Sequence, residues 1–104
     1  MKTIPVNKDV TIDDLFAVLQ SKLNPMFQQR RQQDISLDIV KNGDTIEILQ
    51  PELYEGYLFR LIGVSNNLEV HESEHYVDDI NALTINSILD ELFVEHLGAT
   101  SPQI

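Results

Sequence analysis

The sequence predicts one α+β domain, in which an antiparallel sheet of four or five strands carries two amphipathic helices in the order β-α-β-β-β-β-α. Two observations support this fold class. Apolar residues recur at helical spacing towards both ends of the chain, and alternating runs separated by turn residues fill the middle. Because 104 residues is a common size for one domain, we assign residues 1–104 to a single unit with a frayed tail at 99–104.

The N-terminal part predicts an edge strand followed by a helix. We expect the strand at 2–6, where Pro5 lacks the N–H group that a central strand needs. Thr11 is a favoured N-cap residue. The apolar stripe of the helix is formed by Ile12, Leu15, Phe16, Leu19 and Leu23. Since proline disfavours helical backbone in the residue before it, we expect Pro25 to break or restart this helix.

The run 35–50 predicts a β-hairpin, because Asn42 and Gly43 both tolerate the positive φ of a type I′ turn. The register centred on this turn gives one apolar face, with the pairs Ile39–Ile46 and Leu37–Ile48. On the other face it sets Asp38 opposite Glu47, a like-charge pair that is mildly unfavourable.

The densest apolar run, 57–64, is apolar on both of its alternating faces. One face holds Tyr57, Phe59 and Leu61, and the other holds Leu58, Ile62 and Val64, with Arg60 among them. Such a strand is expected to be central and covered on both sides, and the helices of this chain can supply one cover if they share a face. A second hairpin with a three-residue loop at 65–67 would pair Arg60 with Glu72.

A second helix is predicted after Thr84, a suitable N-cap residue, with Gly98 as its C-cap. Its apolar stripe is Ile85, Ile88, Leu89, Leu92, Phe93 and Leu97. Asp90, Glu91 and Glu95 lie on its outer side, where acids near a helix C-terminus oppose the macrodipole. Because helix stability does not explain these acids, we interpret them as part of an interaction surface.

The net charge of −10 is concentrated in the second half of the chain, where residues 51–104 carry ten acids and one base, Arg60. Such a surface repels phosphate backbones, so nucleic-acid binding is disfavoured, whereas a basic protein partner would be attracted. The chain has no cysteine, which excludes disulfides and thiolate chemistry. With no apolar run long enough for a signal peptide or a membrane span, we expect a cytoplasmic location.

The stretch 71–75 reads His-Glu-Ser-Glu-His and matches the pattern H-E-x-x-H. On a helix, His71 and His75 would share a face and could bind zinc, with Glu72 as general base. In that limited sense the stretch resembles the zincin metallopeptidase motif, and the resemblance implies a zinc-dependent hydrolase. The alternation at 68–70, however, indicates a strand and not a helix. In a strand, residues four apart are separated by roughly 13 Å, too far to share one metal ion.

Three functions therefore remain open. The favoured one is a non-catalytic acidic interaction or assembly module, expected to be a homodimer or to bind a basic protein, through Leu58, Arg60, Ile62, Val64, Asp90, Glu91 and Glu95. The alternative is a domain that binds a small apolar ligand in a cleft lined by Phe16, Phe27, Tyr57, Phe59 and Phe93. The third is the zinc-dependent hydrolase, with His71 and His75 as metal ligands. We assign no cofactor and no catalytic residue, and the sequence favours a protein without enzymatic activity.

Overall fold

The computed structural model describes residues 2–6, 11–64 and 66–97, so the tail expected at 99–104 lies outside the described residues. The α+β fold and the predicted order of elements are confirmed, with five strands in the sheet. The elements are β1 (Lys2–Pro5), α1 (Ile12–Arg31), β2 (Asp38–Asn42), β3 (Thr45–Leu49), β4 (Tyr57–Val64), β5 (Asn67–Glu72), the 3₁₀ helix η1 (Glu74–Tyr76) and α2 (Ile80–Leu97).

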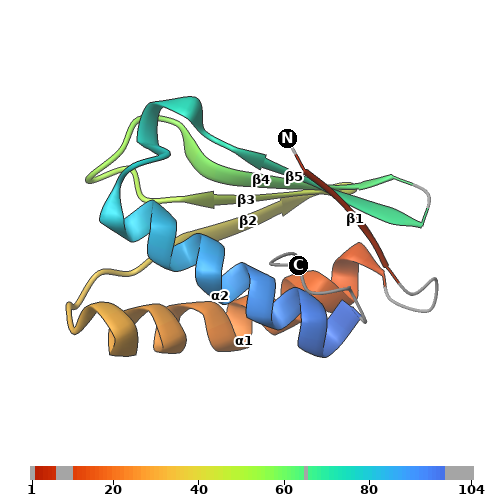
Figure 1. Ribbon diagram of the computed structural model, residues 1–104, viewed down its shortest axis with the longest axis horizontal. Coiled ribbons are helices and arrows are strands. Elements are labelled where there is room, and N and C mark those ends of the chain that lie inside the picture. Colours follow the sequence, from red (N-terminus) through yellow and green to blue (C-terminus); the bar gives the residue numbers. More distant parts are fainter. Residues whose placement is uncertain (1, 7–10, 65, 98–104) are drawn as a thin grey trace.

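The fold has two layers, a sheet and a pair of helices on one side of it (Figure 1). The strands are antiparallel in the order β1-β5-β4-β3-β2, which places β4 at the centre. Helix α1 lies next to β2 and β3, and an ion pair between Lys2 and Asp90 ties β1 to α2. The helices therefore cover one face of the sheet and leave the other without a layer from the described residues.

Among the described residues no helix is long and apolar enough to cross a membrane.

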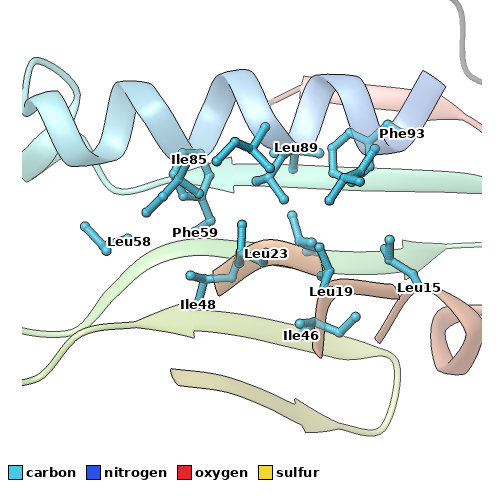
Figure 2. Close-up of a cluster of buried hydrophobic side chains, with 14 of the residues drawn as sticks. Leu15, Leu19, Leu23, Ile46, Ile48, Leu58, Phe59, Ile85, Leu89 and Phe93 are labelled. Atoms are coloured by element: carbon cyan, nitrogen blue, oxygen red, sulfur yellow. The ribbon is translucent and has the colours of Figure 1, made fainter. Parts of the chain in front are cut away.

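The core lies between the helices and the sheet, as Figure 2 shows for side chains from α1, α2, β3 and β4. Its largest members are Phe27, Phe59 and Phe93, each at most 1% exposed. These aromatic rings come from three different elements, so burying them holds the two layers together.

A bulge at the start of β4 changes which side chains enter the core. Tyr57 pairs with Leu49 and Phe59 pairs with Ile48, so Leu58 is an extra residue without a partner on β3. Leu58 is 0% exposed and belongs to the core together with Phe59. The prediction that Leu58 shares the outer face with Ile62 and Val64 is wrong, because strict alternation fails at a bulge.

The first hairpin forms with a register displaced by two residues from the prediction. Asn42 pairs with Thr45, so Gly43 and Asp44 are the turn residues. Gly43 has φ 61° and Asp44 a negative φ, as in a type II′ turn with glycine first. A shift by two keeps every side chain on its predicted face. However, Asp38 lies opposite Leu49, and the predicted like-charge pair does not form.

The second hairpin also differs from the predicted register. Val64 pairs with Asn67, which places Arg60 opposite His71 and leaves Glu72 opposite Phe59. The predicted pair of Arg60 with Glu72 is therefore wrong.

Helix α1 starts as predicted but does not end at Pro25. Thr11 and Asp14 form a capping box, and the helix continues through Pro25 to Arg31. A proline inside a helix costs about 3 kcal/mol. Burial of Leu23 and Phe27, both 0% exposed, offsets this cost because each contributes about 1.5–3 kcal/mol.

Helix α2 begins at Ile80, four residues before the predicted N-cap Thr84. The oxygen Oδ1 of Asp79 accepts hydrogen bonds from the N–H groups of Asn81 (2.9 Å) and Ala82 (3.2 Å), as an N-cap residue does. Thr84 lies inside the helix, where its hydroxyl donates to the carbonyl of Ile80. The prediction of Thr84 as N-cap is therefore wrong.

Candidate functional site

The sheet surface that faces away from the helices is the candidate site, and we call it the open face. Cross-strand pairs place its side chains in adjacent rows, because paired residues point to the same side of a sheet. One row runs Val40–Glu47–Arg60–His71, and the next runs Thr45–Ile62–Glu69.

Arg60 is the centre of the charged part of the open face. Its Nε and one terminal nitrogen lie 2.8 and 2.7 Å from Oε2 of Glu47. The guanidinium carbon lies 4.4 Å from the ring centroid of Tyr57, within the range of a cation–π contact. On the neighbouring strand, His71 Nε2 lies 3.2 Å from Glu69 Oε1. Glu47 and Tyr57 therefore hold the side chain of Arg60 in place.

Apolar side chains flank this charged centre on both sides. Val40 on β2 is 50% exposed and Val64 on β4 is 42% exposed, while Ile62, between Arg60 and Val64 along β4, is partly exposed. The structure therefore places the predicted residues Arg60, Ile62 and Val64 together on the open face. It adds Val40, which was not among the predicted interaction residues.

The acidic residues predicted on the outer side of α2 each form an ion pair within the chain. Asp90 pairs with Lys2 at 2.9 Å, and Glu95 lies 3.9 Å from Lys22. Glu91 pairs with Arg30, whose guanidinium also donates to Ser87. These acids therefore connect α2 to α1 and β1, which explains their presence near a helix C-terminus. They are separate from the open face, so the predicted interaction residues do not form one surface.

The five aromatic residues of the predicted ligand cleft do not converge. Phe27, Phe59 and Phe93 are at most 1% exposed and belong to the core, and Phe16 on α1 packs against this core. Tyr57 lies on the opposite side of the sheet, under Arg60. The predicted grouping is therefore wrong, because the four phenylalanines belong to the core side of the sheet and Tyr57 to the open face.

The two histidines of the zincin-like stretch lie in different elements. His71 belongs to β5 and His75 to η1, so the helix that the motif requires is not formed. Both histidines line a surface depression of about 930 Å³ beside Tyr57 and Tyr76. Among the described residues, no three His, Asp or Glu side chains converge in a way that could hold a metal ion. The arrangement predicted for zinc is therefore contradicted.

Glu72 borders the same depression and is partly buried. Burial raises the pKa of this carboxyl above its ordinary value, and the nearby charge of Lys2 opposes that change. Because Glu72 lies opposite Phe59, on the helix side of the sheet, its carboxyl group lies at the edge of the core.

A polar cluster at the start of α2 was not predicted from the sequence. The hydroxyl of Tyr54 donates to Asp79 Oδ1 at 2.7 Å and accepts from Asn81 Nδ2 at 3.0 Å. Arg31 Nε donates to Asn81 Oδ1 at 2.8 Å. Burial, together with the hydrogen bond to Asp79, raises the pKa of Tyr54. The available sequence signal was Asp79 directly before the apolar pattern of the helix.

Comparisons with protein-family models, with curated proteins and with solved structures find no match to this chain. The geometry of the described surfaces is therefore the basis for a functional proposal.

Proposed function

We propose that the protein is a non-catalytic interaction module that forms a homodimer through the open face. The observation that carries this proposal is the pattern of exposure on the sheet. Val40, Ile62 and Val64 lie on the side that the helices do not cover, and two of them are at least 42% exposed. Apolar residues gathered on one exposed face indicate an association surface. We keep the cytoplasmic location expected from the sequence as part of this proposal.

The size of the open face fits a small dimer interface. Five strands spaced about 4.8 Å apart span roughly 24 Å, and strands of this length give a face of roughly 500 Å². Standard interfaces bury about 800 Å² on each partner. Because the open face is smaller than this, we expect a weak dimer. Two sheets stacked in this way would enclose the apolar side chains of both copies.

The charges of the open face suit contact with a second copy. Arg60 on β4 lies opposite Glu47 on β3, and Glu69 lies on the neighbouring strand β5, so both signs occur within one surface. A two-fold axis can then bring Arg60 of one copy towards an acid of the other. Because each copy carries a net charge of −10, long-range repulsion opposes dimerisation, and added salt should strengthen it.

Sedimentation equilibrium of three proteins tests the proposal. The wild type should dimerise, with a weight-average mass that rises with concentration and with salt. Ile62→Glu, which adds a charge to the open face, should remain a monomer. Val94→Glu makes the same change at an exposed position on α2 and should dimerise like the wild type.

Two results would refute the proposal. One is a wild-type protein that stays monomeric up to about 100 μM, a concentration that detects even weak association. The other is an equal loss of dimer in the Ile62→Glu and Val94→Glu variants, since that would show no preference for the sheet.

A further inference from the structure

A second exposed apolar surface lies at one end of the molecule, where the turn after β3, η1 and the start of α2 come together (left in Figure 1). Its members are Leu53, Val77, Ile80 and Leu83, which are 54%, 42%, 56% and 49% exposed. We call this set the end patch. It holds four of the seven large apolar side chains that are exposed in the described part of the chain. Half-exposed aliphatic side chains gathered in this way indicate a binding surface.

Hydrogen bonds hold the end patch in place without covering it. Tyr54 beside Leu53 binds Asp79 at 2.7 Å, and Asp79 directly precedes Ile80. The hydroxyl of Tyr76 bonds the backbone N–H and carbonyl of Glu55 at 3.0 and 3.1 Å. The rings of Tyr54 and Tyr76 meet edge to face, 4.8 Å apart. The patch residues are therefore presented on a fixed frame, which lowers the entropy cost of binding.

The surroundings of the end patch are acidic. Glu52, Glu55, Glu74 and Asp78 are exposed on the same segments, and none of them forms an ion pair with another described residue. Arg31 also reaches this end, where it binds Asn81. The other described bases pair with acids on other parts of the molecule: Lys2, Lys22, Arg30, Lys41 and Arg60. The four acids around the patch are therefore not paired with a described base and can contact a basic partner.

We propose that the end patch binds a basic amphipathic helix of another protein, with its large apolar side chains on the patch and its lysines or arginines against the surrounding acids. The four patch residues come from a helix and from turns, so a partner meets side chains and not a free strand edge. Helices with an apolar face bind such surfaces through side chains spaced one turn apart. This proposal does not depend on the open face, which lies on the sheet.

Titration calorimetry with a synthetic helix of leucine and lysine, about 18 residues long, tests the proposal at low salt. The wild type should bind, and Ile80→Ser combined with Leu83→Ser should weaken binding at least about tenfold. Val94→Ser removes an apolar side chain that is 41% exposed elsewhere on α2 and should leave the affinity unchanged. Asp78→Asn should weaken binding more than Asp44→Asn, which changes the net charge equally at the distant β2–β3 turn.

The proposal would be overturned if the wild type did not bind, if the wild type and the Ile80–Leu83 double variant had equal affinity, or if a leucine–glutamate helix bound equally well. Binding of phosphatidylcholine vesicles that depends on the patch, with no binding of the basic helix, would also overturn it by indicating a lipid surface. Ile62→Glu should bind the peptide like the wild type, so failure of the dimer proposal and failure of this one give different results.

Discussion

Replacement of Leu58 by alanine tests the bulge that separates the core from the open face. Leu58 is 0% exposed, so truncation removes buried carbon atoms and leaves a cavity. Substitutions of this kind cost about 2–5 kcal/mol, and we expect about 3 kcal/mol here. Val64→Ala, at a position 42% exposed in the same strand, should cost less than about 1 kcal/mol. A domain with a stability of about 5–15 kcal/mol remains folded after either change.

Urea unfolding followed by circular dichroism at one fixed protein concentration measures both changes. With a slope of about 1–3 kcal/mol per molar urea, Leu58→Ala should lower the midpoint by roughly 1–3 M with little change in slope. Val64→Ala should move the midpoint by well under half as much. Similar small shifts for both variants would refute the bulge, because Leu58 would then lie on the exposed face as strict alternation requires.

Three further changes probe other features of the fold. Burial raises the pKa of Glu72, so the protein loses stability as pH rises through the pKa that Glu72 has in the folded state. Glu72→Gln should therefore raise Tm at pH 7. The variant should lose this advantage below about pH 4. Asn24 bonds both the carbonyl (3.0 Å) and the N–H (2.6 Å) of Leu37, so Asn24→Ala should cost about 1–3 kcal/mol in urea unfolding, with Gln20→Ala as the milder control. A Cβ at Gly63 would lie 3.7 Å from Ile12, an ordinary contact, so Gly63→Ala should stabilise the protein by about 0.4–1 kcal/mol in thermal unfolding. Gly56→Ala, at φ +74°, should destabilise it in the same measurement.

The order of elements could be predicted from sequence because each depends on local patterns. Thr11 shows this well, since its cap depends only on Asp14, three residues away. The face of each residue in the first hairpin could also be predicted, because a shift by two residues preserves alternation. The turn position could not, because Asn42-Gly43 and Gly43-Asp44 are both acceptable central pairs and the wider sheet selects between them.

The features that sequence analysis missed depend on contacts between distant residues. Pro25 is tolerated inside α1 because Leu23 and Phe27 are buried, and burial by other elements is not visible in a local window. The acids of α2 could not be matched to their bases because Asp90 and Lys2 are 88 residues apart. The bulge at Leu58 likewise depends on pairing with β3.

The most direct measurement of the central claim, that a second copy covers the open face, uses the absence of native cysteine. A single cysteine in place of Val64 or of Val94 gives one reporter on the open face and one on α2, both at positions about equally exposed in the single chain. The account predicts that maleimide labelling at residue 64 slows as protein concentration rises from about 1 to about 100 μM, while labelling at residue 94 keeps its rate. Equal rates at both positions across that range would contradict it.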